Sequence, residues 1–246
     1  MPRLNNRLEP LRRIARMVPG AMSVGRWLHR LVDPELRSVE RLRRSGVGEL
    51  FQPFATTSED RYPQLFDALA ERHSDLPAPR ILSFGCSTGE EVRALRQRMP
   101  QARITGIDLN PRSVAIARRK DRNPLSEYRV AGAPLDSDRF DAVLALAVFR
   151  HGLLEAERPD DCSARLPFAR FAEGVGKLDA VLEPGGWFAL WNAHFRFTDA
   201  PAAAQYIRDP WSMRDQPPLQ LLYGPDNRRL DGVTEDAVLF RKSAQD

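Results

Sequence analysis

The sequence predicts an α/β protein with a mostly parallel sheet flanked by helices and preceded by a basic helical extension. From Arg80 onward, short apolar strands alternate with helical segments, which is typical of a parallel sheet with crossover helices. The 246 residues, 42% of them hydrophobic and 28% charged, are enough for one such domain with an added segment.

The segment before this alternation, residues 1–58, is predicted to be a basic helical extension or lid. Its first 50 residues contain eleven arginines and five acidic residues. Apolar side chains recur at helical spacing within 11–18 and 24–31, which predicts short amphipathic helices. We expect these helices to dock on the protein's own core. The alternative is contact between the arginines and an anionic surface such as lipid or nucleic acid.

Residues 59–246 are predicted to form the α/β domain. A helix is expected to run to His73 after a capping signal at residues 56–59. Strands are then expected at 80–84, 103–107, 127–130, 142–146, 187–191 and 237–240, with helices at 90–98, 111–119 and 167–181. Residues 192–235 are rich in proline and are predicted to be an irregular cap insertion.

The turn after the first strand, within Ser83–Glu91, has the pattern of a ligand-binding loop. Gly85 and Gly89 allow the backbone to approach a ligand closely or to take a positive φ. Free N–H groups at the start of the next helix favour polar or anionic ligand groups. Asp108 ends the second strand, where its carboxylate can accept both hydroxyls of a ribose. The alternative role of Asp108 is to cap the following helix.

Four segments resemble, in order, the motifs of class I S-adenosylmethionine-dependent methyltransferases. They are residues 84–91, 105–110, 139–151 and 182–187. The first, Gly-Cys-Ser-Thr-Gly-Glu-Glu, is similar to the variant found in chemoreceptor glutamate methyltransferases. The resemblance implies a Rossmann-like, mostly parallel seven-stranded sheet, with S-adenosylmethionine as cofactor and S-adenosylhomocysteine as product.

The resemblance also implies a place for each part of the cofactor. The glycine turn would wrap the methionine part, and Asp108 would hold the ribose. Leu109 would pack on the adenine, whose edge would lie near the residues after the third strand. The end of the fourth strand would line the sulfonium. The cofactor-binding residues implied in this way are Ser83, Gly85, Cys86, Ser87, Gly89, Asp108, Leu109, Ala131, Gly132, Ala145 and Ala147.

His151 is the predicted catalytic residue, because it follows the fourth strand at the carboxyl end of the sheet, where open α/β folds bind their ligands. It would act as a base or orient the acceptor. The alternative is a structural histidine that bonds the backbone. Arg150 would attract an acidic substrate or point to solvent. The residues expected to border the acceptor pocket after the fifth strand are Trp191, Asn192 and His194.

Other classes of site fit the sequence less well. A dehydrogenase would carry G-x-G-x-x-G, because a pyrophosphate must approach the helix, but serines stand at Ser83 and Ser87. The two cysteines, Cys86 and Cys162, form no C-x-x-C pair and no Cys/His cluster. This argues for a reducing compartment and against structural zinc, so no metal is expected.

The sequence therefore predicts a methyltransferase acting on a small-molecule or natural-product acceptor, with O-methylation as one form of the reaction. The alternatives are a peptide, lipid or RNA acceptor docked by the basic extension, and a cofactor-binding scaffold without activity. With no secretory signal pattern and no run of about 18 apolar residues, a cytoplasmic protein is expected.

Overall fold

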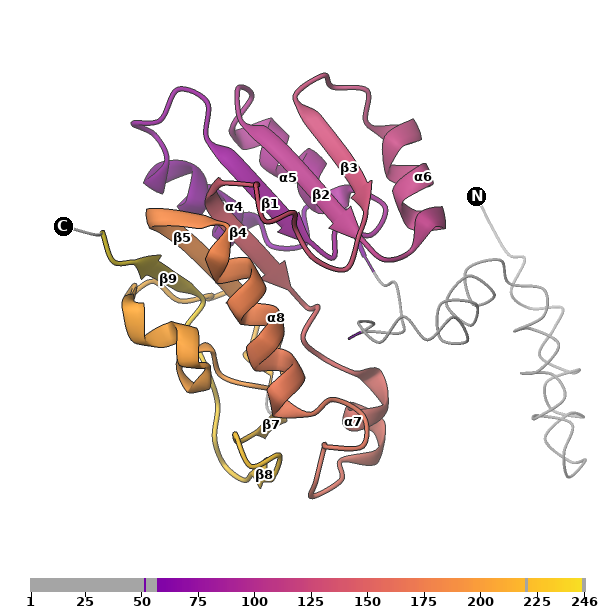
Figure 1. Cartoon of the computed structure of the whole chain (residues 1–246), viewed down its shortest axis with the longest axis vertical. Helices are drawn as coiled ribbons and strands as arrows, with labels where there is room; N and C mark the ends of the chain where they lie inside the picture. Colours follow the sequence, from indigo (N-terminus) through magenta and orange to yellow (C-terminus); the bar gives the residue numbers. More distant parts are fainter. Residues whose placement is uncertain (1–50, 52–56, 220, 245–246) are drawn as a thin grey trace, which may run out of the picture. The chain divides into compact units, whose positions relative to one another are not determined.

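A computed structural model describes residue 51 and residues 57–219 and 221–244. Its main sheet has seven strands in the order β3-β2-β1-β4-β5-β9-β6 (Figure 1). The strands are β1 Arg80–Phe84, β2 Arg103–Asp108, β3 Ser126–Val130, β4 Phe140–Leu146, β5 Leu182–Trp191, β6 Tyr206–Arg208 and β9 Leu239–Lys242. Strands β1 to β5 pair in parallel, and β9 is antiparallel to both neighbours. The predicted fold class is confirmed.

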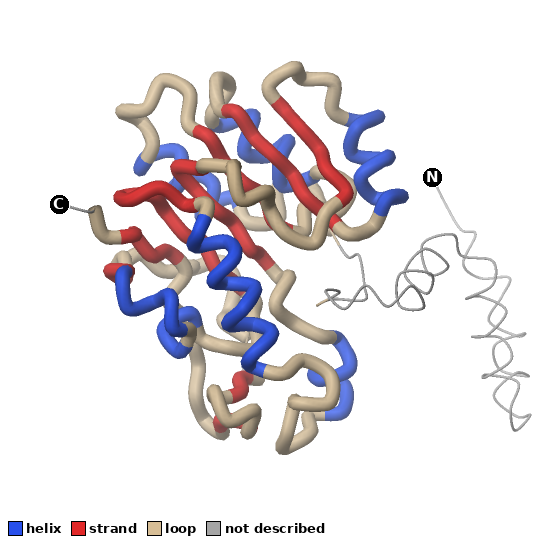
Figure 2. The backbone as a smooth tube through the Cα atoms, viewed as in Figure 1, coloured by secondary structure: helices blue, strands red, loops and turns tan. Residues whose placement is uncertain are grey.

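Helices cover both faces of this sheet. They are α4 Pro63–Arg72, α5 Glu90–Arg98, α6 Pro111–Lys120, α7 Gly152–Glu157 and α8 Phe168–Ala180. Because side chains alternate along a strand, Ile81 packs with buried residues of α4, α5 and α6, whereas Leu82 packs with those of α8. Figure 2 shows α8 lying across one face of the sheet, the face on which Leu82 packs. Within the described residues no helix is long and apolar enough to cross a membrane.

The first described helix departs from its prediction. The capping signal at residues 56–59 does not start it, and α4 begins at Pro63, with Tyr62 as an N-cap that makes no side-chain cap bond. Proline suits the first helical position, because the N–H that it lacks would have no helical partner there. The expected helical extension, apart from Phe51 and residues 57–58, lies outside the described residues. Phe51 itself is buried in the hydrophobic core.

The second half of the chain holds more regular structure than the sequence predicts. The fifth strand, predicted at 187–191, begins earlier, so that Pro184, Gly185 and Gly186 lie inside β5, where its pairing with β4 is irregular. The expected cap at 192–235 contributes β6 to the main sheet. It also contains the 3-10 helices η1 Phe197–Asp199 and η2 Pro201–Gln205 and the hairpin strands β7 Leu222–Tyr223 and β8 Arg229–Leu230.

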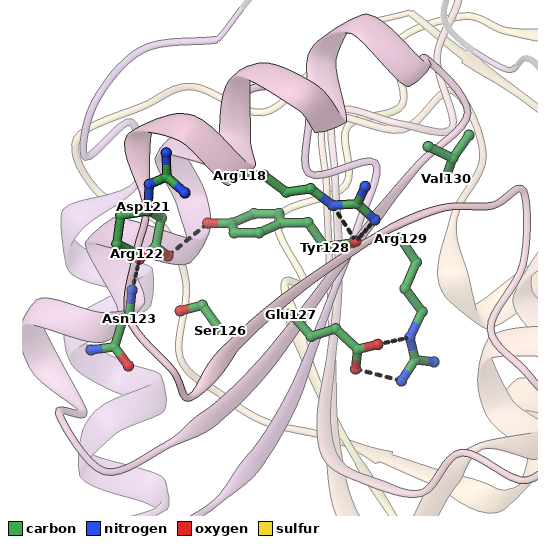
Figure 3. A pocket seen from close by; sticks show the side chains of 9 residues that line it. All are labelled: Arg118, Asp121, Arg122, Asn123, Ser126, Glu127, Tyr128, Arg129 and Val130. Atoms are coloured by element: carbon green, nitrogen blue, oxygen red, sulfur yellow. Dashed lines mark hydrogen bonds and ion pairs between the residues drawn. The ribbon is translucent and has the colours of Figure 1, made fainter.

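Edge strand β3 is fastened to α6 by Tyr128, as Figure 3 shows. The Tyr128 hydroxyl donates to Asp121 Oδ2 at 2.8 Å, and Arg118 Nε donates to the Tyr128 carbonyl at 3.1 Å. A side-chain donor on an edge carbonyl discourages another strand from pairing there. The Tyr128 ring also reaches the glycine turn, since a Cβ built on Gly89 would lie 2.9 Å from its hydroxyl oxygen. The edge strand therefore supports the turn.

Candidate cofactor and acceptor site

The glycine turn connects β1 to α5 in a conformation that requires glycine. Gly85, Ser87 and Gly89 have φ values of +75°, +49° and +84°. The N–H groups of Gly85 and Cys86 both donate to the Ile107 carbonyl, at 2.8 and 3.0 Å, which ties the turn to β2. A Cβ on Gly85 would lie 2.5 Å from a methyl carbon of Val148. The backbone of the turn is therefore held against the segment that follows β4.

Asp108 joins this turn to the start of α6. Its Oδ2 accepts the Ser87 N–H at 2.9 Å, and its Oδ1 accepts the Asn110 N–H at 2.7 Å. Burial raises the pKa of Asp108, while the two N–H groups oppose that rise. Asn110, not Asp108, caps α6 through its side chain, which accepts the Arg112 N–H. Each carboxylate oxygen keeps a lone pair with which it can accept a ligand hydroxyl.

The chemistry of the turn fits a polar adenosyl cofactor. The Ser87 hydroxyl oxygen is buried and has no hydrogen-bond partner within the described part of the chain. Buried polar atoms in native proteins are nearly always paired, so such an atom points to a missing partner. It lies in a glycine turn with a buried carboxylate beside it. Together these groups offer a narrow backbone cradle, a hydroxyl and an acceptor for ribose.

The predicted residues after the other strands lie at the same edge. The Ala131 N–H donates to the Asp108 carbonyl, and Ala147, with φ +58°, donates its N–H to the Trp191 carbonyl at 2.8 Å. Gly132 lines a cavity of about 330 Å³ between the end of β1 and α8. The Ala145 side chain is fully buried in the core. Ala145 therefore supports β4 by packing. Leu109, the residue expected to pack on the adenine, directly follows β2.

Glu91 is a functional candidate that sequence reasoning missed. Its Oε1 accepts a hydrogen bond of 2.7 Å from the Ser83 hydroxyl at the end of β1. Burial raises the pKa of Glu91 to about 7, and the Ser83 hydrogen bond and the positive charge of Arg61 act against that rise. The second glutamate of Gly-Glu-Glu and a serine in the preceding strand were the available signal. Sequence reasoning treated this glutamate only as a helix start.

Tyr62 connects the region around Ser83 and Glu91 to the end of β5. Its hydroxyl accepts a hydrogen bond of 3.2 Å from Asn192 Nδ2. Burial raises the pKa of Tyr62, and the charges of Glu91 and Arg150 also act on it. Asn192, with φ +54°, directly follows β5. Three residues from distant segments, Glu91, Tyr62 and Asn192, therefore lie near one another at the carboxyl ends of the strands. They form one corner of the site.

His151 caps the short helix α7. Its Nδ1 accepts the Leu153 N–H at 3.3 Å. An Nδ1 that accepts a hydrogen bond belongs to a neutral ring with its proton on Nε2. The side chain of neighbouring Arg150 is only 16% exposed, and its Nε donates to Glu155 Oε1 at 2.9 Å. Arg150 is therefore held by Glu155 and does not extend into solvent.

His194 connects the β5 end to the C-terminal hairpin. Its ring is fully buried, with Nδ1 2.9 Å from the Leu221 carbonyl and Nε2 3.4 Å from the His151 carbonyl. Burial lowers its pKa. The buried Trp191 belongs to the core cluster on the α4 face. Of the three residues expected at the acceptor pocket, only Asn192 contacts a side chain of the corner described above.

His194 should make stability sensitive to acid. An unfolded histidine titrates near pH 6.5, whereas folded His194 resists protonation. The unfolded state therefore binds more protons, so stability is full above about pH 6.5 and is lost as the pH falls below it. Urea unfolding at pH 8.0 and 5.5 should show a smaller acid loss for His194→Gln than for the wild type. Equal losses in the two proteins would contradict this assignment.

Comparisons with known proteins identify the domain. Residues 81–166 match the family model described as a methyltransferase domain. The demethylmenaquinone methyltransferase of Thermus thermophilus is 33% identical over 112 residues, covering 44% of each chain. The fatty-acid O-methyltransferase of Mycolicibacterium smegmatis is 28% identical over 175 residues, covering 69% of this chain and 55% of that protein. This chain thus spans about half the length of these relatives.

Among solved structures, the plantazolicin methyltransferase BpumL in complex with S-adenosylhomocysteine is similar at a TM-score of 0.42 and 16% identity. The match covers 65% of this chain and 54% of that chain. Together with the sheet order, the family match identifies a methyltransferase domain of the class I S-adenosylmethionine-dependent type over residues 81–166. This domain is that of a methyltransferase enzyme, and its cofactor is S-adenosylmethionine. The predicted superfamily and cofactor are confirmed.

Proposed function

We propose that this protein transfers a methyl group from S-adenosylmethionine to an oxygen of a small-molecule acceptor. The observation that carries the proposal is the glycine turn joined to Asp108 through the Ser87 N–H, at the carboxyl edge of the sheet. The fatty-acid O-methyltransferase among the relatives supports oxygen as the methylated atom. The acceptor site is the corner where Tyr62 and Asn192 meet beyond β5.

The residues of the turn hold and orient the cofactor in this proposal. The bound cofactor supplies an electrophilic methyl group on sulfur. Gly85 and Gly89 let the backbone follow the methionine part, Ser87 supplies its unpaired hydroxyl, and Asp108 accepts the ribose hydroxyls. In-line methyl transfer depends mainly on positioning and on the exclusion of water. The chain therefore needs a rigid cradle more than a reactive side chain.

His151 orients the acceptor in this proposal. Because its Nδ1 is occupied by the Leu153 N–H, the ring carries its proton on Nε2 and acts as a donor. A donor fits an acceptor oxygen that has already lost its proton, since such an oxygen needs no general base. His151 would then hold the oxygen in line with the sulfur–methyl bond. Its contribution would be that of one directed hydrogen bond.

Replacing His151 by asparagine tests the role in orienting the acceptor without removing the N-cap of α7. Asparagine also accepts the first N–H groups of a helix, so α7 should stay in place. We expect turnover of S-adenosylmethionine with a panel of fatty acids to fall about tenfold, the value of one hydrogen bond of roughly 1.4 kcal/mol. The melting temperature and the Kd for S-adenosylhomocysteine should be unchanged. Unchanged turnover would leave His151 with the structural role alone.

Calorimetric titration tests the cofactor assignment directly. We expect the full chain to bind S-adenosylmethionine and S-adenosylhomocysteine and not NAD. Acceptor-dependent formation of S-adenosylhomocysteine then separates an enzyme from a scaffold, because a scaffold binds the cofactor without turnover. Binding of NAD alone would overturn the proposal. The alternative in which the basic extension docks a larger acceptor concerns residues outside those described.

A further inference from the structure

Arg150 belongs to a segment after β4 that contacts both halves of the proposed site. A Cβ built on Gly85 would lie 2.5 Å from a methyl carbon of Val148, so this segment lies against the glycine turn. The segment is also bonded to the chain beyond β5, because the His194 N–H donates to the Phe149 carbonyl at 2.9 Å. Arg150 therefore follows directly on residues that contact the proposed cofactor site and the chain near the proposed acceptor site.

The guanidinium of Arg150 is held in place but only partly used. Its side chain is 16% exposed. Its Nε and Nη2 both donate to a single oxygen of Glu155, with the Nε bond at 2.9 Å. A guanidinium carries more N–H donors than these two bonds use, and Nη1 has no hydrogen-bond partner among the described residues. One end of the Arg150 fork can therefore donate to a ligand.

The polar groups near Arg150 also have donors to spare. The Tyr62 hydroxyl accepts from Asn192 Nδ2, and its own proton has no acceptor among the described residues. Burial raises the pKa of Tyr62, so this hydroxyl keeps its proton, and the charge of Arg150 acts on it. Trp191 packs in the same core cluster as Tyr62, and its buried Nε1 makes no hydrogen bond within the described part of the chain. This surplus of donors favours a ligand rich in lone pairs.

The groups near Arg150 that could remove a proton from an acceptor already have partners. Glu155 accepts from Arg150, His151 accepts a backbone N–H through Nδ1, and both ring nitrogens of His194 face backbone carbonyls. A hydroxyl acceptor must lose its proton to a base during methyl transfer. A carboxylic acid is already ionised at neutral pH and needs no base. An acceptor that arrives as a carboxylate therefore fits both the donors and these occupied groups.

We propose that the acceptor is a carboxylic acid and that Arg150 selects it by donating to one carboxylate oxygen while the other oxygen receives the methyl group. This proposal rests on the proposed O-methyl transfer. The acceptor oxygen bonds to the methyl carbon as the sulfur–methyl bond breaks, and the electron pair of that bond stays on sulfur. A carboxylate and a sulfonium thus become a methyl ester and a thioether, and no proton is transferred. Because the ester is uncharged, Arg150 holds the product less tightly than the acid.

The experiment is calorimetric titration of the full chain saturated with S-adenosylhomocysteine. The probes are three acids and their matching alcohols: octanoate with octanol, benzoate with benzyl alcohol, and cinnamate with cinnamyl alcohol. We expect at least one acid to bind about tenfold or more tightly than its alcohol, as a charge-assisted hydrogen bond requires. With methyl-labelled S-adenosylmethionine, that acid should give a product that releases labelled methanol in mild alkali. Methyl esters do so, and methyl ethers do not.

Three variants assign the preference for the acid to Arg150. Arg150→Gln should bind the acid about tenfold more weakly and the alcohol as before, with an unchanged Kd for S-adenosylhomocysteine. Arg150→Gln combined with Glu155→Gln leaves no unpaired carboxylate, so it should show the same loss even if the single variant is unstable. The control is Arg165→Gln, which breaks another pair on α7, with Glu157, and should bind like the wild type. A purely structural Arg150 would instead weaken the acid and the alcohol equally.

Three outcomes would overturn the inference while leaving the proposed function intact. The first is that no acid binds more tightly than its alcohol. The second is that Arg150→Gln keeps the preference for the acid. The third is a labelled product that is stable in mild alkali. Failure of the proposed function has a different signature, because the chain would then not bind S-adenosylhomocysteine or would methylate no oxygen acceptor at all.

Discussion

Replacing Asp108 by alanine should weaken the binding of S-adenosylhomocysteine by roughly 10²-fold or more. Two hydroxyls bonded to a charged carboxylate are together worth at least about 3 kcal/mol, which corresponds to that ratio. The same change frees the N–H groups of Ser87 and Asn110, which now bond the carboxylate, so the turn should also lose order. Calorimetric titration of the wild type and the variant measures the ratio.

Matched variants separate ribose binding from order in the turn. Asp108→Asn keeps one oxygen as acceptor and should fall between the wild type and Asp108→Ala. The exposed Asp136, in the loop between β3 and β4, is the control, and Asp136→Ala should bind like the wild type. If Asp108→Ala kept the wild-type Kd, Asp108 would serve the turn alone and the proposed ribose contact would be wrong.

The central strands could be predicted because burial on both faces requires a mostly apolar run of residues, which is visible in the sequence. In β1 and β4 nine of the twelve residues are apolar and all but Arg80 and Asp141 are buried, as expected for a parallel strand between two helical layers. Strands β6, β7 and β8 span two or three residues each, which is too short for such an apolar run. They form because distant partners meet them, which sequence periodicity does not encode.

The part of the site whose residues lie at fixed spacing in the sequence could be predicted. Contacts between residues far apart in the sequence could not. The glycine turn and Asp108 follow strands at fixed spacing, so their meeting could be expected. The hydrogen bond between Ser83 and Glu91 requires the turn to fold α5 back over β1. Tyr62 and Asn192 are 130 residues apart in sequence. Such pairs depend on the sheet order, which one sequence does not specify.

The glycine turn should be the least tolerant part of the domain, and Gly85→Ala should show it. A residue with a Cβ is strained at φ +75°, at a cost of about 1–3 kcal/mol. The new carbon would also lie 2.5 Å from the Val148 methyl, which adds about 1–3 kcal/mol of overpacking. We expect the free energy of unfolding to fall by about 2–6 kcal/mol, the sum of these two costs, measured by urea denaturation.

The matched control is the same substitution at another glycine. Gly176 lies within α8, has no atom within 4 Å of an added Cβ, and has no positive φ. Gly176→Ala should therefore stabilise the protein by about 0.5–1 kcal/mol, because alanine favours the helix. Opposite signs at the two positions would show that the turn demands glycine for its backbone and its close contact with Val148. A small loss at Gly85 would mean that the segment after β4 can move away. The cradle would then be flexible, and positioning by a rigid turn could not be what drives methyl transfer.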